Sequence, residues 1–309
     1  MTLLFMAPGL KAETWIKHLR SQDPEIDLRV WPDVGHPAEV LFVVSWKHPL
    51  GEMKKFPRLK CIASLGFGVD HVLRDPDLPA GVPVTRIVDQ GMIDAMSAYV
   101  LAAVLNYTGL FDLYRQDQAQ KQWKARRPKH PQEVRVGIMG LGNLGADAAR
   151  KLRSLGFPVS GWSRTAKALE GINCFAGDEG LEGFLSRTDI LICLLPLTPA
   201  TEGILNRQTL SKLPDGAYMI NVARGEHLVE EDLLASLESG QISGACLDVF
   251  RQEPLPESHP FWSHPRVTVT PHVASLTYPK AVAPQIIENY HRVRAGQSPL
   301  HVVDVQRGY

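Results

Sequence analysis

The sequence predicts an α/β protein made of two domains, each built around a doubly wound parallel β-sheet. Short runs rich in Val and Ile alternate along the chain with longer stretches of helical periodicity, which is the pattern of successive βαβ units. The chain has 309 residues, whereas a single domain usually has about 100–200 residues. A basic segment with two prolines, at residues 124–131, separates two series of these runs.

The first series predicts a small sheet followed by a long helix. The apolar start of the chain has no basic leader and no small-residue cleavage site, so we expect a first strand there rather than a signal peptide. Residues 92–123 contain no Pro and predict a helix, in which Gly109 is a candidate break. The first half of this helix is apolar on nearly every side, so we expect it to be buried between layers. The strands are expected at residues 3–6, 28–31, 40–45, 61–65 and 82–86, with a helix at 13–20.

The second series predicts a larger sheet of the same kind. A helix at residues 146–155 follows its first strand and is ended by Gly156. The last helix of the chain is expected at residues 280–294. The strands are expected at residues 134–139, 159–162, 190–194, 217–222, 244–249 and 267–270.

The charge balance of the chain argues against polyanionic partners. Thirty-three basic and thirty-three acidic residues give a net charge of zero, whereas nucleic acids and anionic membranes are bound by clustered positive charge. The longest apolar runs, at residues 99–105 and 190–195, are far shorter than the roughly 18 residues of a membrane span. We therefore expect a cytoplasmic protein that binds neither nucleic acid nor a membrane.

The cysteines show no spacing that suits a metal ion or a redox pair. None forms a CxxC motif or stands at a Cys/His ligand spacing, and each lies in an apolar run. We expect no metal site and four small buried side chains, at Cys61, Cys174, Cys193 and Cys246.

A glycine-rich loop lies between the first strand and the first helix of the second series. A strand, such a loop and a helix bring backbone N–H groups and a helix N-terminus up to the pyrophosphate of a dinucleotide. A GxGxxG sequence outside this context is often a plain tight turn, so the flanking elements carry the prediction. The loop consists of Gly140, Leu141, Gly142, Asn143, Leu144 and Gly145.

The end of the next strand distinguishes the two nicotinamide dinucleotides. An Asp or Glu at this place would accept a hydrogen bond from the adenosine ribose 2′-hydroxyl of NAD(H). This chain instead has Ser163, Arg164 and Thr165. A guanidinium pairs with a 2′-phosphate, and hydroxyl groups donate to it. We therefore expect NADP(H) to be preferred and NAD(H) to be the alternative, unless Arg164 is an ordinary solvated arginine.

Three polar residues each follow a predicted strand of the second series. Arg224, Glu253 and His272 lie at or just beyond strand ends, and open α/β sheets bind ligands at the carboxyl ends of their strands. Taken singly, each has a plain structural alternative: a helix cap for Arg224, a surface charge for Glu253 and a loop histidine for His272. Their joint position behind a dinucleotide loop predicts an active site.

These motifs resemble those of a known enzyme family. GLGNLG, NVARG, LDVFRQEP and TPHVAS occur in this order and are similar to the D-isomer-specific 2-hydroxyacid dehydrogenases over nearly the whole chain. The pattern of WSRT, QEPLP before FWSHPRV, and DVQRGY resembles the short-chain bacterial glyoxylate/hydroxypyruvate reductases of that family. The resemblance implies a flavodoxin-like substrate domain at residues 1–97 and 283–309, a Rossmann domain at 98–282, and a cleft between them.

The resemblance assigns a role to each of the three polar residues. Arg224 clamps the carboxylate of a 2-oxo acid, because a guanidinium makes two parallel hydrogen bonds to such a group. His272 donates a proton to the ketone oxygen, where negative charge grows as hydride arrives. Glu253 orients the imidazole and favours its charged form. We therefore expect NADPH-dependent reduction of glyoxylate and hydroxypyruvate to glycolate and D-glycerate.

The resemblance also implies weaker site residues and a homodimer. Trp46 is a candidate apolar wall of the pocket or a core residue, and Phe67 and Gly68 offer backbone N–H groups to the substrate carboxylate. Trp123, near the end of the long predicted helix, is a candidate for reaching the cleft of a partner subunit. The cofactor is expected to contact Leu195, Pro196, Val222, Ala223 and, through its carboxamide, Asp248.

Three other functions share this scaffold, and Ser163 and Glu253 argue against two of them. An NAD-dependent dehydrogenase of the D-lactate type shares the three polar residues but should carry an acid near Ser163. The formate dehydrogenases resemble the same scaffold but carry Gln in place of Glu253. A dinucleotide-sensing binding protein retains the same residues, and a panel of 2-oxo acids with the reduced cofactor would distinguish it from an enzyme.

Overall fold

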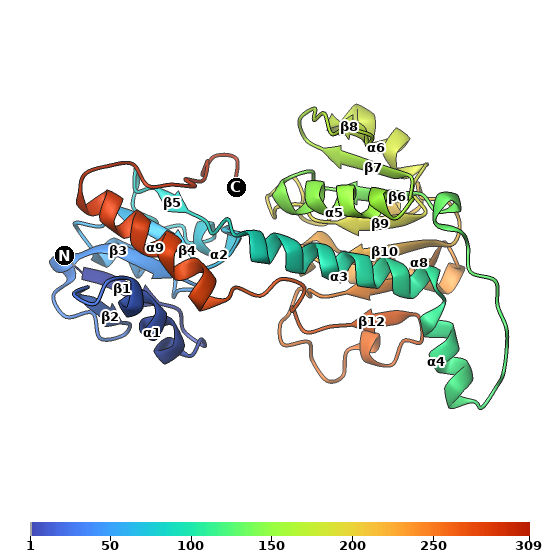
Figure 1. Cartoon of the computed structure of the whole chain (residues 1–309), viewed down its shortest axis with the longest axis horizontal. Coiled ribbons are helices and arrows are strands. Elements are labelled where there is room, and N and C mark those ends of the chain that lie inside the picture. Colours follow the sequence, from blue (N-terminus) through green and yellow to red (C-terminus); the bar gives the residue numbers. More distant parts are fainter. Residues whose placement is uncertain (1) are drawn as a thin grey trace. The chain divides into compact units, whose positions relative to one another are not determined.

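The computed structural model describes residues 2–309 and divides the chain into two compact units (Figure 1). The first unit combines residues up to Met92 with Thr277–Tyr309, and the second unit is Ile93–Leu276. Each unit contains one parallel sheet with helices, so the predicted α/β class is confirmed. The sequence predicts domain boundaries after residues 97 and 282, and the two units of the structure divide after residues 92 and 276. Substrate binding by one unit and cofactor binding by the other stay predictions.

The first unit is built on a five-stranded parallel sheet in the order β2-β1-β3-β4-β5. This is the flavodoxin-like order, in which the chain winds outward from the middle of the sheet in both directions. The strands are β1 (Thr2–Met6), β2 (Leu28–Val30), β3 (Val40–Ser45), β4 (Cys61–Ser64) and β5 (Val84–Thr85). The helices are α1 (Ala12–Gln22), α2 (Asp70–Leu73) and α9 (Pro279–Arg294), with the 3-10 turns η1 (Pro37–Glu39) and η2 (Met53–Lys55).

Both faces of this sheet are covered, which explains why its strands are apolar without interruption. Phe42 and Val44 pack with α1 and α9 on one face. Val43, between them in β3, packs on the other face with Met53 of η2 and Val72 of α2. Successive side chains of a strand point to opposite faces, so a doubly covered strand needs an apolar residue at every position.

The second unit is built on a seven-stranded parallel sheet in the order β12-β11-β10-β9-β6-β7-β8. This is the doubly wound Rossmann order extended by one strand. The strands are β6 (Val136–Met139), β7 (Val159–Ser163), β8 (Asn173–Ala176), β9 (Ile190–Cys193), β10 (Ala217–Asn221), β11 (Ile242–Leu247) and β12 (Val267–Val269). The helices are α3 (Gln90–Thr108), α4 (Phe111–Ala119), α5 (Asn143–Ser154), α6 (Gly177–Leu185), α7 (Arg207–Leu210) and α8 (Glu230–Ser239), with η3 (Pro131–Glu133), η4 (Gly225–His227) and η5 (Pro260–Trp262).

Helices cover this sheet from both sides as well. On one face, Val100 of α3 and Ala149 of α5 pack in the same cluster as Ile192 of β9. Figure 1 shows α3 and α5 in front of the strands in that view. On the other face, Leu233 of α8 packs in the same cluster as Met219 of β10. One face of α3 is therefore buried against the sheet. The expected burial on nearly every side is wrong, because Ala98, Ala102 and Leu105 are exposed.

The long helix expected at residues 92–123 is broken and ends early. The break falls at the predicted place, because α3 ends at Thr108, and α4 begins at Phe111 at an angle of 59°. A Cβ on Gly109 would lie 2.8 Å from the carbonyl oxygen of Leu105, so the turn requires glycine. The expectation that helix extends to about Trp123 is wrong: α4 ends at Ala119, and Trp123 lies in irregular chain with its side chain fully exposed.

Strand β8 was not among the predicted strands. This strand is at the edge of the sheet, and none of its four residues is fully buried, so it lacks the apolar run that marks the other strands. Cys174 lies in β8 and is only partly buried, so the prediction of a buried side chain is wrong for it. The prediction is confirmed for Cys61, Cys193 and Cys246, which are buried.

Within residues 2–309, no single helix is both long enough and apolar enough to cross a membrane. The bent pair α3–α4 meets the length and composition criteria only when the two helices are taken together.

Candidate active site

Three adjacent strands of the second unit end at the same edge of the sheet. Asn221 of β10 is paired with Leu247 of β11, and Leu247 is paired with Val269 of β12. All three strands are parallel, so their carboxyl ends are level. Arg224, Glu253 and His272 follow these ends by three, six and three residues. The structure therefore places the three predicted polar residues along one edge.

Glu253 and His272 are in direct contact. The imidazole Nδ1 of His272 lies 3.0 Å from Oε1 and 2.9 Å from Oε2 of Glu253. The backbone N–H of Phe250 donates to Oε1 of Glu253 at 3.2 Å and holds this carboxylate in place. The His272 side chain is 34% exposed. Because Nδ1 faces the carboxylate, Nε2 is the ring nitrogen left to face a ligand, and no residue of 2–309 bonds to it.

Arg224 lies on a loop that packs tightly against the loop of Glu253. The guanidinium Nη1 of Arg224 donates to the carbonyl oxygen of Ala223 at 2.7 Å, and the Nδ2 of Asn221 donates to the Arg224 carbonyl at 3.0 Å. A Cβ on Gly225 would lie 1.8 Å from the carbonyl carbon of Phe250. The backbones that carry Arg224 and Glu253 are therefore in van der Waals contact, and only glycine permits this approach.

His227 is a residue of this region that sequence reasoning missed. Its imidazole is fully buried. The backbone N–H of Arg224 donates to Nδ1 at 3.2 Å, and Nε2 lies 3.3 Å from the carbonyl oxygen of Pro196. A neutral ring with its proton on Nε2 satisfies both contacts. His227 thus joins the Arg224 loop to the segment expected to line the cofactor, and the sequence offers no signal beyond its position three residues after Arg224.

The glycine loop has the shape that a dinucleotide requires. A Cβ on Gly140 would lie 2.5 Å from the carbonyl oxygen of Leu194, and a Cβ on Gly145 would lie 1.9 Å from that of Gly140. Gly142 differs, because its Cβ would meet no atom within 4 Å. Helix α5 begins directly after Gly142, and no side chain caps its first turn. The free space and uncapped N–H groups fit a pyrophosphate at this helix end.

The residues between the glycines divide by burial. Leu141 is buried and packs on Gly161 of β7, whereas Asn143 is exposed and Leu144 partly buried. Leu195, Val222 and Ala223 are also buried, and Pro196 is partly buried. The side chains of the buried positions serve the core, so they can line a cofactor only through their backbone.

The segment expected to select the adenosine phosphate lies at the end of β7. Ser163 is its last residue, is nearly buried, and donates its hydroxyl proton to the carbonyl oxygen of Thr165 at 2.8 Å. Arg164 and Thr165 are exposed. The engagement of the Ser163 hydroxyl within the loop is a detail that the sequence did not reveal, and it leaves Arg164 and Thr165 as the accessible donors.

Asp248 is buried and already has several donors. Its exposed fraction is 1%. Thr270 and the backbone of Val273 donate to Oδ1, and the backbone of Ala274 donates to Oδ2. One lone pair of Oδ2 remains available, so contact with a carboxamide stays a prediction.

The predicted substrate residues of the first unit follow two paired strands: Trp46 comes directly after β3, and Phe67 and Gly68 lie on the loop after β4. Trp46 is partly buried, its ring lies 4.4 Å from that of His71, and it would contact a Cβ on Gly66 at 2.9 Å. The Ser64 hydroxyl accepts from the N–H of Gly66 at 3.1 Å and donates to the carbonyl of Gly68 at 2.9 Å. This pins the loop. Among the described residues, the N–H groups of Phe67 and Gly68 have no acceptor.

Arg86 is a cation near this loop that the sequence reasoning did not single out. It follows β5, and the next residue, Ile87, donates its N–H to the carbonyl of Gly66 at 3.0 Å. Burial lowers the pKa of the Arg86 guanidinium, and no carboxylate within residues 2–309 forms an ion pair with it. Its signal in the sequence is an arginine directly after a short apolar run.

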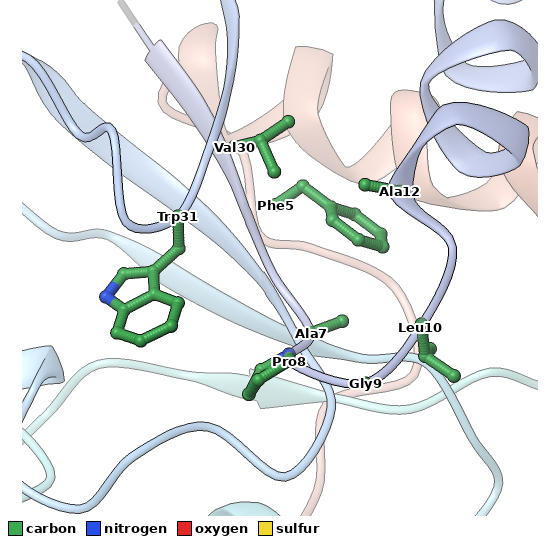
Figure 2. A pocket seen from close by; sticks show the side chains of 8 residues that line it. All are labelled: Phe5, Ala7, Pro8, Gly9, Leu10, Ala12, Val30 and Trp31. Carbon is green, nitrogen blue, oxygen red and sulfur yellow. The ribbon is translucent and has the colours of Figure 1, made fainter.

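Two cavities of the structure lie away from the predicted site residues. A cavity of about 220 Å³ lies in the first unit. Phe5, Leu10 and Trp31 are among the residues that line it (Figure 2). A second, more open cavity of about 770 Å³ lies in the second unit and is lined by Arg135 and Phe175 among others. No predicted site residue lines either cavity. In the part of the chain from residue 2 onward, no three His, Cys, Asp or Glu side chains are grouped so as to hold a metal ion.

Comparison with known proteins identifies the family that this chain resembles. The family model described as D-isomer specific 2-hydroxyacid dehydrogenase, NAD binding domain, matches residues 101–274. The glyoxylate/hydroxypyruvate reductase A of Serratia proteamaculans is 45% identical over 315 aligned residues that cover all of both chains.

Two solved structures extend the likeness. A D-isomer specific 2-hydroxyacid dehydrogenase from Xanthobacter autotrophicus Py2, in complex with NADPH and MES, has a TM-score of 0.95 and 44% identity, with coverage of 100% of this chain and 99% of that chain. An NADPH-dependent glyoxylate/hydroxypyruvate reductase from Sinorhizobium meliloti, in complex with NADP and sulfate, has a TM-score of 0.92 and 36% identity at the same coverage. The chain therefore belongs to the D-isomer specific 2-hydroxyacid dehydrogenase family.

Proposed function

We propose that this protein uses NADPH to reduce glyoxylate and hydroxypyruvate to glycolate and D-glycerate. The observation that carries the proposal is the His272–Glu253 pair, at 2.9 Å, on the sheet edge that also holds Arg224. Full-length relatives named glyoxylate/hydroxypyruvate reductase A and a structural neighbour described as NADPH-dependent support the same reaction.

His272 is the general acid of this proposal. NADPH, held by the glycine loop and the segment after β7, would supply a hydride to the carbonyl carbon, and the ketone oxygen would then need a proton. Nε2 of His272 faces away from Glu253, so it donates its proton to that oxygen while Nδ1 keeps its bond to the carboxylate. Glu253 stabilises the positive charge that the ring carries before the transfer.

Arg224 and the first unit supply the groups that suit a small 2-oxo acid. The guanidinium of Arg224 pairs with the substrate carboxylate in two parallel hydrogen bonds. In the first unit, the N–H groups of Phe67 and Gly68 are suited to bind a carboxylate, and the indole of Trp46, which lies over Gly66, is suited to exclude longer tails. These roles follow from the chemistry of the residues and from the family.

NADP(H) is preferred over NAD(H) in this proposal. Residues 163–165, at the end of β7, include no acid, and Arg164 and Thr165 are exposed there. Their guanidinium and hydroxyl bind the 2′-phosphate of the adenosine ribose. NADPH and NADP in the complexes of two similar proteins support this preference.

The test is the initial rate of NADPH and of NADH oxidation with glyoxylate, hydroxypyruvate, pyruvate and phosphohydroxypyruvate. We expect NADPH-linked turnover of the first two. We also expect Arg224→Ala to lower kcat/KM by about 10- to 150-fold, the range for a charged hydrogen bond of roughly 1.5–3 kcal/mol. NADH-linked turnover of pyruvate would favour a dehydrogenase of the D-lactate type instead. Tight NADPH binding without turnover of any of the four would favour a dinucleotide-sensing protein.

We also propose a homodimer that acts in the cytoplasm, where NADPH is available. Apolar side chains of the second unit are exposed around α3 and α4, and burial of such a patch favours association. Sedimentation at micromolar concentration should give about twice the monomer mass. The exposed residues are Leu105, Phe111, Leu113 and Trp123.

A further inference from the structure

His272 has a backbone conformation that needs support. Its φ is 54°, in the left-handed region that residues with a Cβ rarely occupy. Such a conformation persists only when the surrounding structure holds it. Asp248 provides much of this support, because its carbonyl oxygen accepts from the N–H of His272 at 2.8 Å.

The carboxylate of Asp248 binds the chain on both sides of His272. After His272, the N–H of Val273 donates to Oδ1 and the N–H of Ala274 donates to Oδ2, each at 2.9 Å. Before His272, the hydroxyl of Thr270 donates to Oδ1 at 2.6 Å. One buried side chain therefore holds the segment that displays the imidazole at three points.

The hydrogen bond from Thr270 to Asp248 is the last in a series of hydrogen bonds between side chains. The hydroxyl of Tyr99, on α3, lies 2.5 Å from that of Thr270 and 3.4 Å from the thiol of Cys246. A carboxylate only accepts, and Thr270 has a single proton to give. Tyr99 must therefore donate to Thr270, and the thiol of Cys246 must donate to Tyr99.

Tyr99 and Cys246, the two groups farthest from Asp248 in this series of hydrogen bonds, keep their protons at all ordinary pH values. Burial raises the pKa of the Tyr99 phenol, and it raises the pKa of the Cys246 thiol to about 11. In this series of hydrogen bonds, Cys246, Tyr99 and Thr270 therefore each donate in the direction of the Asp248 carboxylate.

We propose that Tyr99 and Thr270 are positioning residues that act through Asp248 to hold His272 in its left-handed conformation for proton donation. The inference rests on the proposed function, because it takes His272 to be the acid. Without the Thr270 hydroxyl, Oδ1 loses a charge-assisted hydrogen bond and the carboxylate gains freedom to turn. The loop then samples conformations in which Nε2 is misplaced, and small misplacements of a catalytic group slow the chemical step.

Four variants test the proposal. Thr270→Val keeps the shape and removes the hydroxyl, Thr270→Ser keeps the hydroxyl, and Tyr99→Phe removes the outer donor. Tyr107→Phe is the matched control: Tyr107 lies on α3, and its hydroxyl is 2.9 Å from that of Ser243, near the start of β11 and away from the site edge.

The expected result is a loss in kcat with little change in KM. Thr270→Val should lower kcat about tenfold and Tyr99→Phe about threefold, as expected for one hydrogen bond lost directly or indirectly. The double variant should be no slower than Thr270→Val, because Tyr99 acts through Thr270. Thr270→Ser should restore kcat to within about twofold of wild type, and Tyr107→Phe should leave it unchanged. Equal kcat values in Thr270→Val, Tyr99→Phe and Tyr107→Phe would overturn the proposal.

Hydrogen–deuterium exchange gives a readout that does not depend on turnover. The amides of Val273 and Ala274 should exchange faster in Thr270→Val and Tyr99→Phe than in Tyr107→Phe. Unchanged exchange would contradict the proposal that the hydrogen bonds of Tyr99 and Thr270 hold the loop. Faster exchange with unchanged kcat would overturn the catalytic part. If the wild type reduces no 2-oxo acid, the proposed function fails, and exchange alone decides whether the chain of hydrogen bonds holds the loop.

Discussion

The two ring nitrogens of His272 have different surroundings, and this difference makes the proposed proton transfer testable. Nδ1 faces both oxygens of Glu253, and Nε2 is left for the substrate. The acid must carry a proton to donate, so His272→Gln, whose amide is not an acid, should lower kcat/KM for reduction by at least about 100-fold. Glu253→Gln keeps an oxygen for Nδ1 but removes the negative charge beside the ring, so it should lower kcat/KM about tenfold.

The measurement is kcat/KM for reduction at a single pH in the wild type, Glu253→Gln and His272→Gln. Activity should fall from the wild type to Glu253→Gln and again to His272→Gln. Activity of His272→Gln close to that of the wild type would assign the acid to another group.

Arg164 makes the cofactor preference a question about one side chain. It is exposed directly after β7, at the place where an acid would repel a phosphate. Arg164→Ala should raise KM for NADPH about 10- to 100-fold, as expected for a lost charge-assisted hydrogen bond, and should change KM for NADH little. Lys167→Ala removes an exposed charge three residues further on and serves as the control. Equal effects of Arg164→Ala on both cofactors would contradict a phosphate contact.

At the scale of elements, sequence periodicity predicts what is buried and misses what is half exposed. All eleven predicted strands are present, because each is an apolar run covered on at least one face by helices. The edge strand β8 and the end of the broken helix at Ala119 escaped prediction, since little burial constrains their sequences. The same limit applies to the site: strand ends carried the prediction of Arg224 and His272, whereas the buried contact of His227 with Pro196 has no periodic signature.

Gly142 and Gly145, between β6 and the first turn of α5, are expected to have different roles. A Cβ on Gly142 meets open space, whereas one on Gly145 would lie 1.9 Å from the carbonyl oxygen of Gly140. Gly142→Ala should therefore leave the unfolding temperature nearly unchanged and weaken NADPH binding at least tenfold, because the methyl group fills the space for the pyrophosphate. Gly145→Ala should cost about 1–3 kcal/mol of stability through overpacking. Fluorescence titration and thermal unfolding separate the two effects, and normal NADPH binding by Gly142→Ala would place the pyrophosphate elsewhere.

At the scale of the whole molecule, the chain passes twice from one unit to the other, after Met92 and after Leu276. Tyr99 lies shortly after the first passage and Thr270 shortly before the second. Their hydrogen bond, at 2.5 Å, joins two segments 171 residues apart. Contacts of this kind decide how the site is held, and no local pattern announces them because each partner alone is an ordinary Tyr or Thr. Motif order therefore predicted which residues follow the strand ends but not what fixes their positions.

Three buried polar side chains in the first unit are joined by hydrogen bonds and link the stability of the fold to pH. The side chains of His48 and Asp75 are fully buried and lie 3.0 Å apart, and Nδ1 of His48 is 2.9 Å from the hydroxyl of Ser45. Burial lowers the pKa of His48 in spite of Asp75. Burial alone would raise the pKa of Asp75, but hydrogen bonds from Asp77, His48 and Gly51 hold it below its usual value. A neutral imidazole thus donates to an ionised carboxylate.

The sign of the pH effect follows from proton uptake on unfolding. Below about pH 6.5, the released His48 takes up a proton that the folded state excludes, so stability falls as pH falls, by at most about 1.4 kcal/mol per pH unit. Calorimetry from pH 7.5 to 5.5 should show a drop in the unfolding temperature of the first unit in the wild type and a smaller drop in His48→Gln, whose amide still donates to Asp75. His18→Gln, on α1, should retain the wild-type drop. An identical drop in all three proteins would mean that His48 is already protonated in the folded state, and that the buried pair is charged on both sides.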